Sequence, residues 1–442
     1  MGGEWHILRL GNVCRKIGSG ATPRGGSSVY LEHGDVALIR SQNIYNNGFH
    51  RDGLVYLTEQ HASELANVQV EENDVLLNIT GDSVARACQV TSDILPARVN
   101  QHVAIIRTDS SVLWPRYLRY YLVSPSMQAE MLGLAGVGAT RNALTKGMIE
   151  SFEIPAPVDV DEQRAIAHIL GTLDDKIELN HRMSEALEAI ARAMFKCWFV
   201  DFDPVRAKAS GEPPESICRR LRLTPDLLAL FPDRFVDSEL GEIPEGWEVK
   251  PFSETVQIIG GGTPKTSVSE YWGGDIPWFS VVDAPAESDV FVIDTEKKIT
   301  QTGLDDSSAR ILSAGTTIIS ARGTVGKVAL VGVPMAMNQS CYGLRGLDGG
   351  SFFTYYATRE LVSTLKQHSH GAVFDTITRN TFAGVSVVTF QPVVTAFETV
   401  VTPLMEKIKA NSVQGRTLAE LRDTLLPKLL SGELRVPVRS AS

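Results

Sequence analysis

The chain has 442 residues, which is too long for a single hydrophobic core of ordinary size and suits two or more domains. Hydrophobic residues make up 43% of the chain, as is typical of a globular protein. No apolar run reaches the ~18 residues of a membrane span, and the N-terminus lacks a signal-peptide pattern, so we expect a cytoplasmic protein. The formal net charge of −10 argues against wrapping of nucleic acid by bulk electrostatics alone, and five scattered cysteines without a CxxC pair argue against a disulfide framework or a zinc site.

The first 158 residues alternate short β-branched runs with turns and one or two short helices. Representative runs are VALIRS, VLLNIT and VAIIRT, at 36–41, 75–80 and 103–108. Such runs, bounded by turn residues, are typical of buried strands. The pattern predicts a globular α/β domain over residues 1–158.

Residues 161–199 carry apolar side chains at alternating steps of four and three, with charges on the other faces. This heptad pattern predicts a long helix, about 57 Å if some 38 residues each rise by 1.5 Å. The stepping returns from Phe397 onward, and both segments contain Lys-Ile-x-x-Asn on the stripe, at 176–180 and 407–411. Each stripe alone also suits an ordinary bundle core, but the shared register favours an antiparallel, coiled-coil-like pair. Its predicted core is Leu170, Leu173, Ile177, Asn180, Leu187, Met194, Leu404, Ile408, Asn411 and Leu418.

The stretch after the first long helix is rich in proline. Pro204, Pro213, Pro214, Pro225 and Pro232 all fall within residues 201–240. Because proline interrupts regular structure, we expect a connector here, with some local helix around 224–231. It would return the chain from the end of the helix to the start of a second domain.

The chain repeats itself at a slowly drifting offset of roughly 240 residues. The repeated features keep one order, as a tandem duplication requires and chance does not. They are Trp5 and Trp247, the Thr-Pro steps at 22–23 and 263–264, the glycine turns after Gly81 and Gly323, Asn-Gln at 100–101 and 338–339, Tyr-Tyr at 120–121 and 355–356, and Thr-Arg-Asn at 140–142 and 378–380.

These observations predict an α+β fold with two similar globular α/β domains, separated by a pair of long antiparallel helices and related by a pseudo-two-fold axis. The predicted segments are a first domain at 1–158, a central helix at 159–200, a connector at 201–240, a second domain at 241–392, and a C-terminal helix with its tail at 393–442. Such a spacer can hold two heads about one turn of DNA apart, roughly 34–36 Å.

Catalytic motifs are scarce. The segment 323–328 ends in Gly-Lys but lacks the upstream Gly and the following Ser/Thr of a phosphate-binding loop, and the glycine turns at 18 and 260 lack a dinucleotide fingerprint. There is no HExxH, no metal-ligand spacing and no GxSxG elbow. We therefore expect no catalytic residues, no metal and no cofactor in this chain.

Several segments, in the same order over nearly the whole chain, resemble one known family, the specificity (S) subunits of type I restriction–modification enzymes. These segments are 5–23, FKCWFVDFDPVRAKASGE at 195–212, LFPDRFVDSELGEIPEGWEV at 230–249, the GGGTPKTS…YWGGDIPWFS run, and LRDTLLPKLLSGEL at 421–434. The Trp-Phe-x-Asp-Phe-Asp-Pro run is far more specific than any glycine turn.

The resemblance implies a non-catalytic DNA sequence-recognition subunit. Two target-recognition domains would each read one half of a bipartite, asymmetric double-stranded target, and the helices would set the gap between the halves. Two modification (methyltransferase) subunits would dock on the helices, and restriction (translocase/nuclease) subunits would join through them. S-adenosylmethionine and ATP with Mg²⁺ would then be bound only by those partner subunits. Outward helix residues such as Arg164 and Phe195 are candidates to meet the modification subunits.

Polar residues on the recurring turns are the candidate DNA contacts, because Arg and Lys suit phosphates while Asn, Gln and Arg suit base edges. In the first domain they are Arg40, Gln42, Asn43, Thr80, Ser83, Arg86, Asn100, Gln101, Thr140, Arg141 and Asn142. In the second they are Thr263, Lys265, Ser280, Arg322, Thr324, Lys327, Asn338, Gln339, Thr378, Arg379 and Asn380. For each residue alone, a turn-forming or solvated role is the competing interpretation. Arg86 and Lys327 are the strongest candidates.

Two other function classes remain open from the sequence. One is an autonomous enzyme, such as a fragment of a fused methyltransferase–specificity polypeptide, and the other is a two-headed scaffold that binds protein. Specific DNA binding in the presence of modification subunits would favour the recognition subunit, and methyl transfer by the isolated chain would favour the enzyme.

Overall fold

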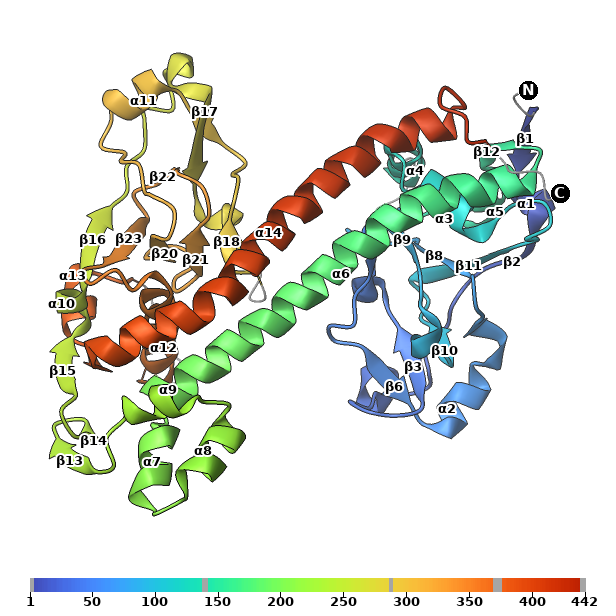
Figure 1. The fold of residues 1–442 in the computed structure, drawn as a ribbon. Helices are drawn as coiled ribbons and strands as arrows, with labels where there is room; N and C mark the ends of the chain where they lie inside the picture. Colours follow the sequence, from blue (N-terminus) through green and yellow to red (C-terminus); the bar gives the residue numbers. More distant parts are fainter. Residues whose placement is uncertain (1–3, 137–141, 286–288, 369–375, 438–442) are drawn as a thin grey trace. The chain divides into compact units, whose positions relative to one another are not determined.

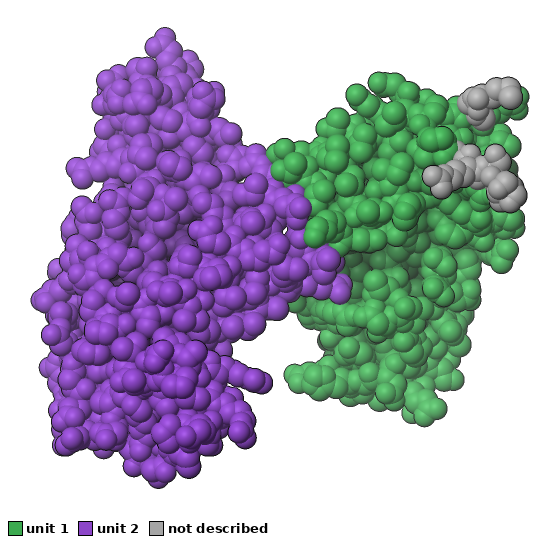
Figure 2. Space-filling model, viewed as in Figure 1, with its two compact units in different colours: residues 1–177, 417–442 green, residues 178–416 purple. Residues whose placement is uncertain are grey.

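The computed structural model of the chain describes residues 4–136, 142–285, 289–368 and 376–437. The chain divides into two compact units, residues 1–177 with 417–442 and residues 178–416 (Figure 2). Each unit holds a mixed α/β head and one stretch of each long helix (Figure 1). Within the described residues, no helix combines the length and the apolar character that a membrane span requires.

The head of unit 1 is built from four small sheets. Two of them have four strands, in the orders β2-β11-β8-β9 and β6-β3-β10-β7, and the other two pair β1 with β12 and β4 (Ile44–Tyr45) with β5 (Gly48–Phe49). β3 and β10 are parallel, and most of the other pairs are antiparallel. The strands are β1 (Trp5–Arg9), β2 (Cys14–Ser19), β3 (Val36–Ile39), β6 (Val55–Leu57), β7 (Gln69–Val70), β8 (Val75–Asn78), β9 (Ala87–Gln89), β10 (Ala97–Val99), β11 (Val103–Thr108) and β12 (Glu153–Pro157).

Most helices of this head lie beside the start of the long helix, and one, α2 (Glu59–Glu64), lies at the opposite end of the head (Figure 1). β8 is buried along its full length and β11 nearly so, as their continuous β-branched runs predict. The helices are α1 (Leu10–Val13), α2 (Glu59–Glu64), α3 (Pro115–Leu122), α4 (Pro125–Gly136) and α5 (Lys146–Glu150).

The head of unit 2 repeats this plan. Its sheets have the orders β16-β23-β20-β21-β18, β19-β17-β22 and β15-β24, and β17 is parallel to β22 as β3 is to β10. The elements are β15 (Glu248–Pro251), α10 (Phe252–Thr255), β16 (Val256–Gly260), β17 (Trp272–Phe279), β18 (Phe291–Val292), β19 (Lys298–Ile299), α11 (Gln301–Asp305), β20 (Thr317–Ser320), β21 (Val328–Val331), β22 (Ala336–Met337), β23 (Cys341–Gly346), α12 (Ser351–His368), α13 (Arg379–Ala383) and β24 (Ser386–Thr389). The predicted duplication is confirmed.

The two predicted long helices are also confirmed, as α6 (Val160–Phe199) and α14 (Gln391–Leu430). In unit 2 the Asn411 amide donates to the Asn180 carbonyl at 3.3 Å and to Ser184 Oγ at 3.2 Å. In unit 1 Arg422 donates to Asp174 at 2.8 Å. Residue numbers fall along α14 as they rise along α6, so the helices pair in antiparallel fashion within each unit.

The predicted core positions of this pair differ in burial. Leu170, Asn180, Ile408 and Asn411 are buried. The other predicted positions are only half-buried, because two helices alone leave one side of each stripe open to solvent. These are Leu173, Ile177, Leu187, Met194, Leu404 and Leu418. Phe195 is buried among aromatic rings and is not an outward residue, since Phe199 and Phe353 lie 5.2 and 5.7 Å from it.

The connector is more regular than predicted. It forms α7 (Asp203–Ala209), α8 (Pro214–Leu221), α9 (Pro225–Ala229) and the hairpin β13 (Phe235–Ser238) with β14 (Gly241–Pro244). Pro204, Pro214 and Pro225 occupy the first turns of the three helices. A backbone N–H has no acceptor within the helix at this position, so the missing N–H of proline costs no hydrogen bond. The local helix expected around 224–231 is α9, and the structure adds α7 and α8, which Pro204 and Pro214 begin and which the proline pattern did not predict.

Candidate nucleic-acid interface

The Gly-x-Thr-Pro turn and the Asn-Gln turn meet in both units, although nearly 80 residues separate them in each copy. Thr22 Oγ1 donates to Gln101 Oε1 in unit 1, and Thr263 Oγ1 donates to Gln339 Oε1 in unit 2. A glycine allows this approach: a Cβ on Gly20 would lie 2.0 Å from the Val99 carbonyl oxygen. In unit 2 a Cβ on Gly261 would lie 1.9 Å from the Asn338 carbonyl oxygen, so both turns need a residue without a side chain.

The asparagine of each Asn-Gln turn holds its own turn in place. Asn100 Oδ1 accepts from the His102 amide at 3.1 Å, and Asn338 Oδ1 accepts from the Ser340 amide at 3.0 Å. Asn100 is buried and its oxygen is committed to the turn, so this side chain holds the turn, and its contact with DNA stays a prediction. The neighbouring glutamines, Gln101 and Gln339, are exposed.

A short 3-10 turn follows β3 in unit 1 and β17 in unit 2, next to the Asn-Gln turn. These are η2 (Ser41–Asn43) and η6 (Val281–Asp283). Asn43 Oδ1 accepts from the Arg40 amide at 3.0 Å, and Asp283 Oδ2 accepts from the Ser280 amide at 2.8 Å. The turns are therefore equivalent, at an offset of 240 residues.

The capping side chains of these turns are structural. Asn43 is fully buried and its side chain also donates to the His50 and Asp52 carbonyls, so it holds the turn, and its contact with DNA stays a prediction. Ser280 Oγ donates to Asp283 at 3.0 Å and is tied to the turn in the same way. The outward positions of the turn are instead Gln42 and Val282, both exposed.

A third shared turn joins β8 to β9 and β20 to β21. Gly81 and Gly323 open it at φ of 77° and 76°. The Ala85 amide donates to the Asn78 carbonyl, and the Gly326 amide donates to the Ser320 carbonyl, both at 2.9 Å. Ala85 has φ of 74°, a left-handed conformation. The equivalent residue in unit 2 is a glycine, Gly326, with φ of 81°.

Arg86 and Lys327, the two strongest candidates, follow these left-handed residues at equivalent positions. The Arg86 guanidinium lies 4.6 Å from the centre of the Tyr45 ring, which orients it. Lys327 is exposed, and its amide donates to Ser320 Oγ at 2.8 Å. The site thus places one cation on the same turn of each unit.

A polar chain links two of these turns in unit 1. The Gln101 amide donates to His102 Nε2 at 3.0 Å, and His102 Nδ1 lies 2.6 Å from Thr80 Oγ1. Ser83 Oγ accepts from the side-chain Nδ2 of Asn78 at 3.1 Å. The bonds therefore join Thr80 to Gln101 through His102, and they add Thr22, which was not among the candidate contacts.

The last predicted match between the copies was wrong. Thr378 caps α13, accepting from the Thr381 amide at 3.4 Å, and the residue that does the same for α5 is Thr145, with a bond of 3.3 Å from Met148. The Leu144 and Ile377 amides donate in the same way to the carbonyls of Ile79 and Ala321, the residues that follow β8 and β20. The first copy has more residues than the second in the segment before this turn, so the offset falls from 238 to 233. Thr145 and Lys146, not 140–142, therefore correspond to Thr378 and Arg379.

The remaining candidates divide by exposure. Thr140 and Arg141 lie outside the described residues. Exposed candidates are Gln42, Gln101, Asn142, Lys265, Arg322, Thr324, Lys327, Gln339, Thr378, Arg379 and Asn380. Partly exposed candidates are Arg40, Thr80, Ser83, Arg86, Thr263, Ser280 and Asn338. Their contacts with DNA stay predictions.

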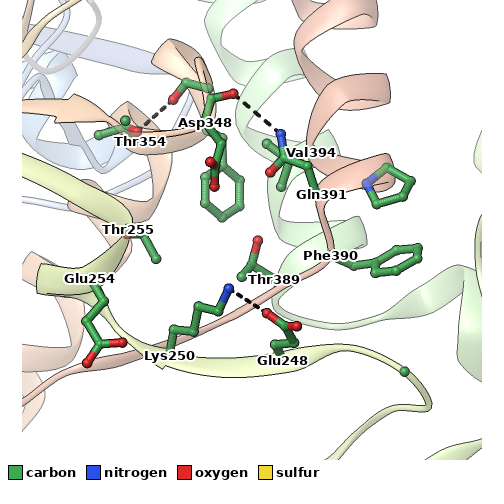
Figure 3. Close-up of a pocket in the computed structure, with 15 residues that line it drawn as sticks. Glu248, Lys250, Glu254, Thr255, Asp348, Thr354, Thr389, Phe390, Gln391 and Val394 are labelled. Carbon is green, nitrogen blue, oxygen red and sulfur yellow. Dashed lines mark hydrogen bonds and ion pairs between the residues drawn. The ribbon is translucent and has the colours of Figure 1, made fainter.

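A separate pocket of about 230 Å³ lies in unit 2, where β15, α12 and α14 begin (Figure 3). Its polar groups are paired with one another: Lys250 bonds Glu248 at 2.5 Å, and Thr354 Oγ1 donates to the Gly350 carbonyl at 2.6 Å. None of the predicted DNA contacts lines it. Beside it, burial raises the pKa of Glu398 to about 7, although its oxygen accepts from the Phe353 amide at 2.7 Å.

The described residues offer little for covalent or metal chemistry. Burial raises the pKa of the Cys88 and Cys341 thiols to about 12, so neither is a thiolate nucleophile near neutral pH. Across residues 4–136, 142–285, 289–368 and 376–437, no three His, Cys, Asp or Glu side chains gather as metal ligands. The shared turns instead present hydroxyl, amide and cationic side chains, which suit noncovalent recognition of DNA.

The model of the type I restriction modification DNA specificity domain matches the chain twice, at residues 2–189 and 244–387. The chain is 28% identical to the HindI specificity subunit of Haemophilus influenzae, over 98% of this chain and 100% of that one. It is 26% identical to the MjaIX specificity subunit of Methanocaldococcus jannaschii, over 98% and 94%. The S subunit structure from M. genitalium has the same fold, with a TM-score of 0.59, 14% identity, and coverage of 99% of this chain and 97% of that one. Because the family model covers both repeats, the chain belongs to the specificity subunits of type I restriction–modification systems.

Proposed function

We propose that each head binds one half of a bipartite, asymmetric double-stranded DNA target, and that α6 and α14 fix the gap between the halves and dock two modification subunits. Methyl transfer with S-adenosylmethionine, and ATP- and Mg²⁺-dependent translocation and cleavage, would take place in the modification and restriction subunits. This chain would act in the cytoplasm and supply sequence recognition only.

One observation carries the proposal: both units build the same three turns with the same hydrogen bonds, yet present different side chains on them. Gln42 is replaced by Val282, Arg86 by Lys327 and His102 by Ser340. A conserved scaffold with exchanged surface residues suits two readers of two different sequences. Two identical readers would instead favour a symmetric target.

Exposed apolar side chains on α6 support the docking role. Leu179 and Ile190 are 52% and 50% exposed. They stand eleven residues apart, which is about three turns, so they share one face of the helix. Two separate side chains do not form a continuous apolar patch, so they identify the face of α6 on which docking is to be tested.

The direct test of DNA contact uses the complex with its modification subunits. Arg86→Ala and Lys327→Ala should each weaken specific binding and reduce the dependence of log affinity on log salt by about one unit, as loss of one phosphate contact does. Arg15→Ala is the matched control. Arg15 lies near the start of β2, at the end away from the Gly-x-Thr-Pro turn, and it pairs with Asp109 at 3.2 Å. Absence of specific binding with all partners present would overturn the proposal.

Docking is tested separately by co-purification. Leu179→Ser with Ile190→Ser should reduce recovery of modification subunits, whereas Leu240→Ser, an equally exposed change in the connector, should not. Equal recovery for both variants would remove this face of α6 from the interface.

A further inference from the structure

The side chain of Val282 is the most exposed of the large apolar side chains in the part of the chain that the structure describes, at 70%. It does not lie on a flexible tail. It sits at the middle of η6, directly after β17, whose Phe279 carbonyl accepts from the Asn338 amide at 2.9 Å. The turn that carries Val282 therefore follows the end of the strand that is bonded to the Asn-Gln turn of the candidate interface.

The turn that carries Val282 is held rigidly. Asp283 Oδ2 accepts from the Ser280 amide and hydroxyl at 2.8 and 3.0 Å. Its other oxygen accepts from the Glu296 amide at 2.7 Å, which ties the turn to the neighbouring loop. A side chain on such a support can select a ligand by shape, since its position does not adapt.

The duplication shows what kind of position this is. The equivalent residue in unit 1 is Gln42, exposed on a turn with the same cap. Glutamine is suited to the hydrogen-bonding edge of adenine, whereas an apolar side chain in a major groove is suited to the C5-methyl group of thymine. The exchange of Gln for Val would therefore change the class of base group that is read.

We propose that Val282 is a specificity-determining residue that packs against the methyl group of one thymine in the half-target read by unit 2. This rests on the proposed function, since it requires that the turn face DNA. Ser280, the polar residue of the same turn, contributes by holding the turn.

The experiment uses the complex with modification subunits and the target duplex identified from its methylated adenines. Each thymine of both half-targets is replaced, one at a time, by deoxyuridine, which removes only the methyl group. One replacement should weaken binding by the wild-type complex roughly fourfold, the size expected for burial of one methyl group. Val282→Ala should bind the normal target more weakly by a similar factor and should lose sensitivity to that one replacement.

Gln42→Ala is the matched control, and it should keep the deoxyuridine sensitivity that Val282→Ala loses. Because Val282 is exposed, its truncation leaves the fold intact, and co-purification with modification subunits should be unchanged. The inference is overturned if no thymine is sensitive, if Val282→Ala keeps the sensitivity, or if Val282→Ala loses the modification subunits instead. In all three cases specific binding by the wild-type complex would still uphold the proposed function, which fails only if that binding is absent.

Discussion

The two units attach their heads to the helix pair by different forces. In unit 1 the centre is one carboxylate, Asp174 on α6, which accepts from Arg119 and Tyr120 of α3 at 2.8 and 2.6 Å and from Arg422 of α14 at 2.8 Å. By the offset of the Lys-Ile-x-x-Asn repeat, 231 residues, the counterpart of Asp174 is Met405. The duplication has kept the geometry and exchanged the chemistry.

In unit 2 the corresponding junction is mainly aromatic. Phe195 of α6 lies 5.7 Å, between ring centres, from both Phe353 and Tyr356 of α12, and the fully buried Phe397 of α14 lies 6.2 Å from Tyr356. One ion pair, from Arg359 of α12 to Glu188 of α6 at 2.6 Å, also joins the head to the helix pair. Rings at these distances contribute beyond their buried area, and their attraction depends little on pH. The comparison teaches that a repeated fold conserves where a head meets its helices more strictly than how it is held there. It also predicts that the two junctions fail under different conditions.

The largest expected effect is on the aromatic junction. Phe397→Ala should cost unit 2 about 3–5 kcal/mol, because it removes a fully buried ring and leaves a cavity. Hydrogen–deuterium exchange should accelerate in α12 and the adjoining part of α14, while α3 in unit 1 keeps its protection. Similar acceleration in both units would show that the junctions are not independent.

Loss of the ionic junction should be nearly as costly. Asp174→Asn should destabilise unit 1 by about 3 kcal/mol at pH 7, because Arg119 stays buried without its countercharge. Exchange should then accelerate in α3 and not in α12. Asp175→Asn is the neighbouring control and should change little, since the Asp175 side chain is 69% exposed.

The same variant should show a definite pH dependence. Burial alone would raise the pKa of Asp174, but Arg119, the hydrogen bond from Tyr120 and Arg422 together lower it below its ordinary value. A lowered carboxyl pKa stabilises the fold above the unfolded pKa of about 4, and this contribution is lost as pH falls through the folded pKa. The difference between wild type and Asp174→Asn should therefore shrink on acidification below about pH 4. A constant difference from pH 7 to pH 3 would contradict the ionic account.

Unit 2 should respond to pH with the opposite sign. Burial raises the pKa of Glu398 to about 7, so the folded state holds a proton that the unfolded state has released. Stability should fall as pH rises from about 4.5 to about 7, by up to roughly 3 kcal/mol. Glu398→Gln, which cannot ionise, should remove this loss in α12 exchange. A wild-type unit 2 that gains stability over the same range would contradict it.

The smallest effect should be equal in the two units. Thr22→Val and Thr263→Val each remove the hydroxyl that bonds the glutamine of the Asn-Gln turn, and each should cost about 1 kcal/mol. DNA binding should weaken in both variants because the glutamine is freed. Unequal costs, measured by exchange of the turn amides, would mean that the shared bond plays different parts in the two copies.

Much of the fold follows from periodicity and repetition in the sequence. The heptad stripes predicted α6 and α14, and the recurring turns predicted two copies of one head. The turns themselves could be found because a close backbone approach at Gly20 and Gly261 demands glycine in both copies.

Side-chain direction could not be predicted in the same way. Asn43 and Asn100 are of a residue type that can read bases, yet both side chains are buried and hold their own turns. The correspondence of Thr378 with Thr145 could not be recognised from the sequence because the two copies differ in length just before these residues. Phe195 was misplaced because a heptad describes only the face toward one partner helix, and the head of unit 2 covers another face.

The central claim is that two different heads on one helical spacer read two different half-sites. Sequencing of methylated adenines in DNA from cells that contain this chain and its modification subunits tests it most directly. The account predicts two short, dissimilar sequences separated by a gap of fixed length and variable composition, with Gln42→Ala relaxing the requirement for one half and Val282→Ala for the other. A single continuous motif, or a gap of varying length, would contradict it.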